Sequence, residues 1–178
     1  ADSYSDTLQD GRLGLPARQY LQQRQVPLEA VAQYRLGFAP HPGAVGWDFL
    51  LRALATKYTH ETLEKAGLAA LSNKGSYYDR FRSRILFPLQ DMSGRVAAFG
   101  GRIIGEGMPK YMNSPETIIF DKSRLLFGLH PHRETIRAKK QAIVVEGNFD
   151  LLLLAVHGVK NVVAPLGTAL TRQHLHAL

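Results

Sequence analysis

The C-terminal part of the chain carries the pattern that most restricts its fold. AIVVEG (142–147) is a short continuous apolar run, as expected for a strand buried on both faces. NFDLLLLAVHG (148–158) has the composition of an apolar helix closed by a glycine, and NVVAPLG (161–167) is a second apolar strand. The three segments predict a βαβ unit, whose crossover is almost always right-handed. A final helix is expected from about Leu170 to the end.

The preceding residues show other periodicities. Helical spacing of apolar residues predicts short helices at about 15–25, 28–35, 47–56 and 60–70, the last with Thr59 as N-cap, and another at 131–139. RILFPLQ and RVAAFGGRI flank the turn signal Asp91–Gly94, which predicts an antiparallel hairpin. The fold class is therefore α/β: an α+β subdomain over residues 1–140 with an antiparallel hairpin, followed by a βαβ unit over residues 141–178.

Three local features of the first subdomain are distinctive. Pro88 predicts a strand edge or a bulge, because proline cannot donate to a sheet ladder. Gly100 and Gly101 are expected to end the regular pairing and to let another group approach the backbone closely. KYMNSPETIIFDK (110–122) has turn chemistry at its centre and is expected to be neither helix nor strand.

Composition narrows the class of protein. The chain has 178 residues, of which 45% are hydrophobic and 21% charged, as in globular proteins, and it has no apolar run of membrane-spanning length. Its net charge of +7 favours a polyanionic partner, and nucleic acid over a membrane, because no basic amphipathic stretch is present. The absence of cysteine excludes disulfides and thiolate zinc sites and fits an intracellular protein. Since the sequence has no initiator Met, we expect it to begin inside a longer chain.

Two carboxylates lie at the predicted end of the first parallel strand. Glu146 ends the strand, and Asp150 follows one helical turn later, after Gly147. Ligands of open α/β sheets bind at the carboxyl ends of the strands, so this pair is a candidate for metal binding or acid–base chemistry. The alternative is that both acids only stabilise a helix N-terminus.

Other candidates involve arginine, histidine and glycine. Arg80, Arg82 and Arg84 alternate, and an extended strand would present them on one face, where they would suit phosphates or keep an edge strand soluble. The pairs His130/His132 and His174/His176 are not favoured as metal sites, because thiolates are absent and residues two apart on a helix diverge by about 200°. Gly105–Gly107 lacks the context of a phosphate-binding loop.

Several long motifs resemble one family. They are YLQQR (20–24), YRLGFAP (34–40), YDRFRSRILFPLQDMSGRVAAFGGRI (78–103), PKYMNSPETIIFDKSRLLFGL (109–129), VVEGNFD (144–150) and NVVAPLGTALT (161–171). In this order they resemble the bacterial replicative DNA primase of the DnaG type, over about residues 15–178. The resemblance implies part of the RNA polymerase domain, in which a basic N-terminal subdomain precedes a TOPRIM subdomain. The parent enzyme would synthesise short RNA primers on single-stranded DNA from ribonucleoside triphosphates.

The resemblance also implies roles for individual residues. Glu146 and Asp150 would be catalytic acids that hold Mg²⁺ or Mn²⁺, with the remaining ligands beyond the C-terminus. The nucleotide-binding positions would be Arg24, Arg102 and Lys110. The template-binding positions would be Arg80, Arg82, Arg84, Tyr111 and Lys122, of which Arg84 is included for its place in the arginine row.

Further expectations concern what surrounds this part of the enzyme. Zinc would belong only to an upstream domain absent here, and the replicative helicase would bind through another absent domain. The protein would act in the bacterial cytoplasm, at the replication fork and without a membrane partner. The TOPRIM unit looks truncated before its Asp-x-Asp motif, so the fragment alone is expected to be inactive.

Two departures and two rival interpretations accompany the resemblance. Asn148-Phe149 replaces the family's Tyr-Met between the two acids, and His130-Pro131-His132 stands where an aromatic-acidic pair is usual. Another TOPRIM protein (a topoisomerase, a recombination mediator or a nuclease) would share the βαβ pattern but not the segment at 110–122. A nucleic-acid-binding module without catalysis is the other alternative.

Overall fold

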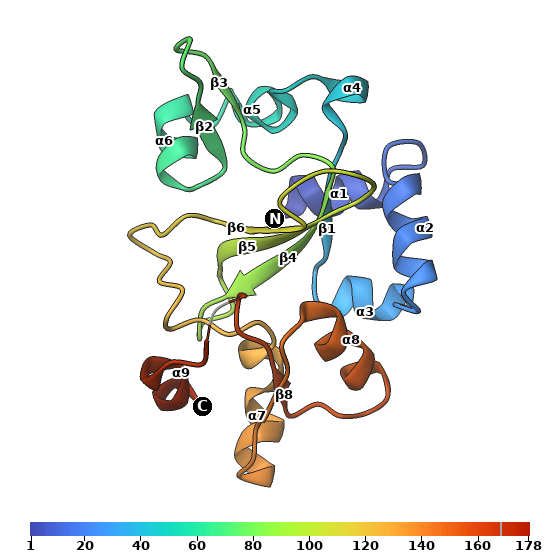
Figure 1. Ribbon diagram of the computed structural model, residues 1–178, viewed down its shortest axis with the longest axis vertical. Helices are drawn as coiled ribbons and strands as arrows, with labels where there is room; N and C mark the ends of the chain where they lie inside the picture. The colour runs from blue at the N-terminus through green and yellow to red at the C-terminus, as the bar shows by residue number, and fades with distance from the viewer. Residues whose placement is uncertain (168) are drawn as a thin grey trace.

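A four-stranded antiparallel sheet lies at the centre of the computed structural model, which describes residues 1–167 and 169–178 (Figure 1). Its strand order is β1–β4–β5–β6, formed by Gly37–Ala39, Arg84–Gln90, Val96–Ile103 and Tyr111–Asn113. β4 and β5 form the predicted hairpin, which is confirmed. Its turn depends on Gly94, whose φ of 81° lies in the left-handed region, and on Asp91, whose carboxylate accepts from the backbone N–H groups of Ser93 and Arg95.

The predictions for Pro88 and for the glycine pair of this hairpin differ in how well they agree with the structure. Pro88 lies beyond the residues of β4 that pair with β1, so β4 is a sheet edge on that side, as predicted. The expectation that Gly100 and Gly101 end the pairing is wrong, because both pair with β4 on one side and β6 on the other. The expected close approach is confirmed: a Cβ atom on Gly100 would lie 3.2 Å from Asn148 Nδ2.

Short helices surround the sheet. They are α1 (Asp2–Gln9), α2 (Leu15–Gln23), α3 (Leu28–Gln33), α4 (Pro42–Val45), α5 (Phe49–Leu54) and α6 (His60–Lys65). Thr59 caps α6 as predicted, since its side chain accepts from the N–H of Thr62. The helix predicted to reach residue 70 is too long, because Gly67 takes a φ of 71° and Ala69–Leu71 forms strand β2. β2 pairs with β3 (Tyr77–Asp79), and this hairpin groups with α5 and α6 at one end of the molecule (Figure 1).

The other end of the molecule is built by the C-terminal elements, namely α7 (Leu129–Lys139), β7 (Ile143–Val144), α8 (Asn148–Val156), β8 (Val162–Val163) and α9 (Arg172–Ala177). β7 and β8 are parallel and α8 connects them, so the predicted βαβ unit is confirmed. Thr168, part of the motif at 161–171, lies outside the described residues.

The expectation that both strands of this unit are buried is wrong for β7. Ile143 and Val144 are 36% and 41% exposed, whereas Val162 and Val163 of β8 are buried. β8 lies between β7 and the bridge that joins Phe127 to Ala164, so β7 is the edge. Residues 111–113 also differ from expectation, because they form β6 and extend the sheet.

One apolar core joins the sheet to the βαβ unit. Phe87 from β4, Leu21 from α2 and Phe149 and Leu151 from α8 all belong to the same buried cluster. The start of α8 is therefore packed directly against the sheet. This packing decides where Glu146 and Asp150 lie.

Candidate active site and nucleic-acid surface

Glu146 and Asp150 line one pocket, of about 300 Å³, between the sheet and the start of α8. The other lining residues are Tyr111, Asn113, Gly147, Asn148, Pro165, Leu166 and Gly167. Glu146 follows β7 and Asp150 lies in the first turn of α8, so the βαβ topology brings both carboxylates to the carboxyl end of the strands. The sequence-based expectation that these two acids converge is confirmed.

Both carboxylates point to solvent in the pocket. Within the part of the chain that the structure describes, no side chain forms a capping hydrogen bond at the N-terminus of α8, although Asp150 lies in the first turn, where negative charge is favoured. Asp150 lies close over Gly147, where a Cβ atom would be 2.6 Å from Asp150 Oδ2. A side chain at position 147 would therefore displace the Asp150 carboxylate.

The opposite wall of the pocket is fixed by asparagines. Asn113 Nδ2 donates to the carbonyl oxygen of Leu166 at 2.8 Å, which ties β6 to the loop after β8. Gly100 leaves room for both Asn113 and Asn148, because a Cβ atom there would lie 3.3 and 3.2 Å from their side chains. The loop and the sheet edge thus form a continuous wall facing the two acids.

Two of the predicted nucleotide-binding arginines come together beside this pocket. Arg102 on β5 donates from Nε to the hydroxyl of Tyr20 at 3.1 Å, and its guanidinium carbon lies 5.0 Å from the centre of the Tyr111 ring. Arg24, which follows α2, has its guanidinium carbon 5.3 Å from the Tyr20 ring and 5.3 Å from the Phe149 ring. Tyr20 therefore contacts both arginines.

Arg102 has one guanidinium nitrogen without a hydrogen-bond partner among the described residues. This nitrogen, NH1, is buried. A buried guanidinium N–H without an acceptor is costly. Tyr111, stacked on Arg102, also lines the pocket of the two acids, so the cationic cluster and the pocket share a wall.

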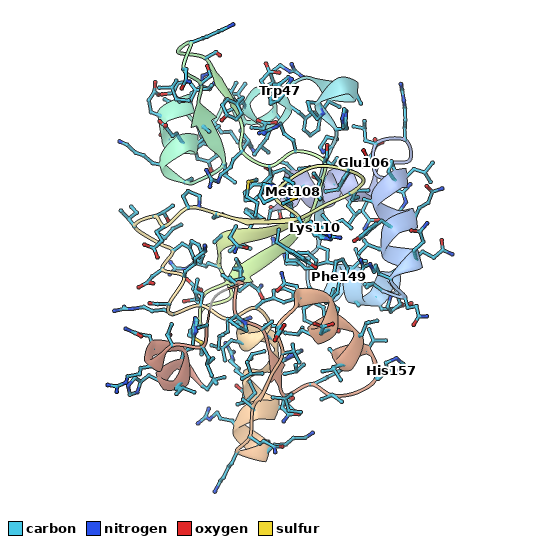
Figure 2. The ribbon with its side chains drawn as sticks, viewed as in Figure 1. Trp47, Glu106, Met108, Lys110, Phe149 and His157 are labelled. Atoms are coloured by element: carbon cyan, nitrogen blue, oxygen red, sulfur yellow. The ribbon has the colours of Figure 1, made fainter. Side chains whose placement is uncertain are left out.

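Lys110 lies on an exposed loop between β5 and β6, directly before Tyr111. Figure 2 shows Glu106, Met108 and Lys110 together along this loop. Buried Arg84 holds its base: NH2 donates to the carbonyl oxygen of Pro109 at 2.8 Å, and NH1 lies 3.4 Å from the carbonyl oxygens of Lys110 and Gly101. Arg84 thus supports Lys110 rather than a solvent-facing surface.

The prediction that Arg80, Arg82 and Arg84 share one face of a strand is wrong. β3 ends at Asp79 and β4 begins at Arg84, and Ser83 between them takes a left-handed φ of 53°. This residue reverses the side-chain direction, so Arg84 turns inward while Arg80 and Arg82 remain in the connecting loop. The three arginines alternate in the sequence, but they do not lie on one strand, so their side chains do not share a face.

Arg82 lies against two aromatic rings that contact each other edge to face, with centres 6.1 Å apart, and neither ring is predicted as a site residue from the sequence. Its guanidinium carbon is 4.7 Å from the centre of the Trp47 ring and 5.1 Å from that of Tyr78. Trp47 is 59% exposed (Figure 2), although it is a large apolar residue. An exposed ring over an arginine is a stacking surface for nucleic-acid bases. The only sequence signal was an isolated Trp after a Gly- and Pro-rich loop.

Asp79 holds the backbone that carries Trp47. Its carboxylate accepts from the N–H groups of Leu50 and Leu51 at 2.7 and 3.1 Å, at the start of α5. Its own N–H donates to the carbonyl oxygen of Trp47 at 2.7 Å. Burial raises the pKa of Asp79, while the two backbone donors favour its charged form. Trp47 is therefore anchored through its backbone while its ring stays exposed.

The segment that carries Lys122 is fixed by α9. His174 Nε2 bonds the carbonyl oxygen of Lys122 at 2.9 Å, and Thr171 Oγ1 donates to the carbonyl oxygen of Ser123 at 2.7 Å. His174 is fully buried and completes a capping box with Thr171. His174 therefore has a structural role in holding this loop, and its burial requires no metal ligand.

His132 also has a structural task. Its Nδ1–H donates to the carbonyl oxygen of Val162 at 2.6 Å, and its Nε2 accepts from the hydroxyl of Tyr34 at 2.5 Å. Burial raises the pKa of Tyr34 to about 12, so this hydroxyl keeps its proton. Burial lowers the pKa of His132. A neutral imidazole thus links α3, α7 and β8, and His130 packs on the hairpin turn at Gly94.

The oxygen ligands available in the pocket suit a hard divalent cation, although they form only part of a site. Glu146 and Asp150 offer carboxylate oxygens, which Mg²⁺ and Mn²⁺ prefer. Over residues 1–167 and 169–178, no group of three or more histidines and acids is placed to hold a metal ion. Within the same ranges, no helix is both long and apolar enough to cross a membrane.

Comparison with known proteins decides the family. Residues 4–133, more than half of the chain, match the family model for the N-terminal domain of the DNA primase catalytic core. The chain belongs to the DNA primase catalytic core family. Residues 140–178 match the Toprim domain, so the primase resemblance and the α/β fold class are both confirmed. This result favours primase over the topoisomerase, recombination-mediator and nuclease alternatives.

Relatives and solved structures agree with this assignment. DNA primase of Salmonella typhimurium is 42% identical over 92% of this chain, and that of Pseudomonas aeruginosa is 40% identical over 100% of it. The catalytic core of E. coli primase has a TM-score of 0.90 at 40% identity, covering 99% of this chain and 55% of that one. A DnaG primase catalytic domain bound to single-stranded DNA has a TM-score of 0.89 at 40% identity, covering 99% of this chain and 56% of that one.

The primase chain described here corresponds to a minor part of its curated relatives. It spans 28% of the Salmonella typhimurium primase and 26% of the Pseudomonas aeruginosa primase. Synthesis of primers is a property of those longer proteins, and its assignment to this chain is a proposal.

Proposed function

We propose that this chain supplies the nucleotide- and template-binding part of a primase that synthesises RNA primers on single-stranded DNA. The reaction is nucleotidyl transfer: a 3′-oxygen forms a bond to the α-phosphorus of a ribonucleoside triphosphate, the bond to the β-phosphate oxygen breaks, and pyrophosphate leaves. The residues of this chain would bind and orient both reactants at the pocket of Glu146 and Asp150. The observation that carries the proposal is Tyr111, which lines that pocket and stacks on Arg102.

Binding of the triphosphate would fall to Arg24, Arg102 and Lys110. The arrangement of the arginines supports this role, because Tyr20 contacts both Arg24 and Arg102, and Arg102 lies against Tyr111, which lines the pocket. Arginine and lysine offset the negative charge that builds up on the leaving pyrophosphate. Arg84 enters the proposal as a positioning residue for Lys110.

Template binding would use the remaining predicted residues. Arg80, Arg82 and Lys122 would contact phosphates, and Tyr111 with Trp47 would stack on bases. The exposed ring of Trp47 against Arg82 supports this arrangement, because stacking and charge act together in single-strand binding. The single-stranded DNA bound to a similar primase domain is consistent with it.

Glu146 and Asp150 would hold Mg²⁺, or Mn²⁺, in the complete site. When bound, the ion would supply charge stabilisation at the reacting phosphate. Two carboxylates hold magnesium weakly, because this ion keeps its water shell unless several ligands converge. We therefore expect the 178-residue chain not to synthesise primers by itself. Zinc is assigned to a separate zinc-binding domain, as seen beside the polymerase domain in the Aquifex aeolicus primase structure.

Cellular context follows from the same proposal. A primase of this kind would act at the bacterial replication fork, in the cytoplasm, and would meet the replicative helicase through another domain.

A salt titration tests the template surface. Binding of a fluorescent single-stranded oligonucleotide would be measured by anisotropy at several salt concentrations, for the unchanged chain and for Arg82→Ala, Lys122→Ala and Arg95→Ala. Each lost phosphate contact should reduce the magnitude of the slope of log K against log salt by about 0.7. Arg95, paired with Asp91 at the hairpin turn, is the matched control that removes one arginine elsewhere.

The proposal requires reduced slopes for Arg82→Ala and Lys122→Ala and an unchanged slope for Arg95→Ala. Equal reductions in all three variants would show that net charge alone governs binding. Unchanged slopes in all three would remove these residues from the template surface.

A further inference from the structure

Phe149 occupies an unusual position between the two halves of the site. It is the second residue of α8, directly before Asp150, and it is only 5% exposed. Its ring packs perpendicular to Phe87 of the sheet, with centres 5.2 Å apart, and against Tyr20 of α2, with centres 6.0 Å apart. Figure 2 shows Phe149 at the end of α8 that faces the sheet. A ring held on these two sides cannot shift without disturbing the core.

The guanidinium of Arg24 lies on both of these aromatic side chains. Its carbon is 5.3 Å from the centre of the Phe149 ring and 5.3 Å from that of Tyr20, within the range of cation–π attraction. Arg24 has no ion pair among the described residues, so the rings are what restrict its long side chain. Restricting a side chain before it binds lowers the entropy lost on binding.

We propose that Phe149 and Tyr20 are positioning residues that fix the guanidinium groups of Arg24 and Arg102 relative to the Asp150 carboxylate. Phe149 does this for Arg24 through its ring, and Tyr20 does it for Arg102 through its hydroxyl. The inference deepens the proposed function, on which it rests, because it says how triphosphate-binding cations are fixed relative to the helix that carries an acid. Motion of α8 would then be transmitted to Arg24 through one buried ring.

Three substitutions separate these contacts. Phe149→Met keeps an apolar side chain of similar length but removes the ring under Arg24. Tyr20→Phe keeps both rings and removes only the acceptor of Arg102 Nε. Phe127→Met is the matched control. Phe127 also packs on Phe87, with ring centres 5.7 Å apart, but among the described residues no arginine forms a cation–π contact with its ring.

The probe is inorganic tripolyphosphate, titrated into the full 178-residue chain without divalent cations. The readout is the NMR signal of the arginine Nε–H groups, assigned for Arg24 and Arg102. In the unchanged chain both signals should move with the probe, and the free Arg24 signal should show the ring-current shift of stacked aromatics. Phe149→Met should abolish that shift and weaken tripolyphosphate binding about three- to tenfold.

The other variants complete the test. Tyr20→Phe should displace the free Arg102 signal and weaken binding about two- to fivefold while Arg24 keeps its ring-current shift. Because it removes a single oxygen atom, it also serves if Phe149→Met does not fold. Phe127→Met should bind tripolyphosphate within about twofold of the unchanged chain, as expected for a core change away from the arginines.

Several results would overturn the inference. Binding within twofold after both Phe149→Met and Tyr20→Phe, or equal weakening by Phe127→Met, would show that the rings only fill the core. If the Arg24 signal does not shift when tripolyphosphate is added, and the chain still binds single-stranded DNA, the inference is wrong. The template-binding proposal is not affected by that result. Failure to bind either probe would contradict both.

Discussion

The arginines show how far one residue type can diverge within a short stretch. Arg82 lies against Trp47 and Tyr78 and bonds carbonyl oxygens of its own loop, whereas Arg84, two positions later, is 4% exposed and bonds the carbonyl oxygen of Pro109 in another loop. The sequence predicts a basic cluster here, but it does not predict which arginine turns inward. That choice depends on Ser83 entering the left-handed region, which residues other than glycine rarely adopt.

Arg84 gives a prediction at this scale. Arg84→Met should lower the free energy of unfolding by about 2–4 kcal/mol, because buried carbonyl oxygens lose their charged donor. Arg95→Met, which removes an exposed partner of Asp91, should lower it by less than about 1 kcal/mol. Urea denaturation followed by circular dichroism measures both values. Similar small losses would mean that Arg84 does not anchor the loop of Lys110.

At the scale of elements, local patterns predicted the hairpin and the βαβ unit, and tertiary packing decided the rest. The turn signal at 91–94 and the apolar runs at 142–147 and 161–167 are strong local cues, and all three are confirmed. The sequence does not predict β6, because three residues beside a proline-containing turn are too few to show an alternation of apolar and polar side chains. They form a strand because they pair with the edge of β5. Exposure of β7 was missed because an apolar run does not reveal which strand is the edge.

The His132 link predicts a pH dependence between elements. Burial lowers the pKa of His132 in the folded chain below its ordinary value of 6.5, so the unfolded chain binds this proton first as pH falls. Stability contributed by the neutral imidazole is therefore present above about pH 6.5 and lost below it, at up to about 1.4 kcal/mol per pH unit.

The comparison variant is His132→Gln, which cannot titrate. Between pH 7.5 and 5.5 the unchanged chain should lose about 1 kcal/mol more unfolding free energy than this variant, measured by urea denaturation. Parallel losses would show that His132 is accessible to protons in the folded chain, contrary to its contacts with Tyr34 and Val162.

For the whole molecule, the central feature is that the site lies across two parts of the sequence. Arg24, Arg102 and Tyr111 come from the region that matches the primase N-terminal domain, and Glu146 and Asp150 come from the Toprim match. Spacing alone predicted the acid pair, because parallel topology brings strand ends to one edge. Convergence of the arginines on that edge followed only from the family resemblance, since it depends on the shared core around Phe87 and Phe149.

The most direct test of this account compares synthesis with binding in a primase that contains this segment at its native length. Glu146→Gln keeps the size and hydrogen-bonding ability of the side chain and removes its charge. Primer synthesis from ribonucleoside triphosphates should fall at least about a hundredfold, as expected when a metal-binding acid is lost. Affinity for single-stranded DNA should stay within about twofold, because Glu146 is not among the cationic and aromatic residues of the template surface. Undiminished synthesis by Glu146→Gln would contradict the account.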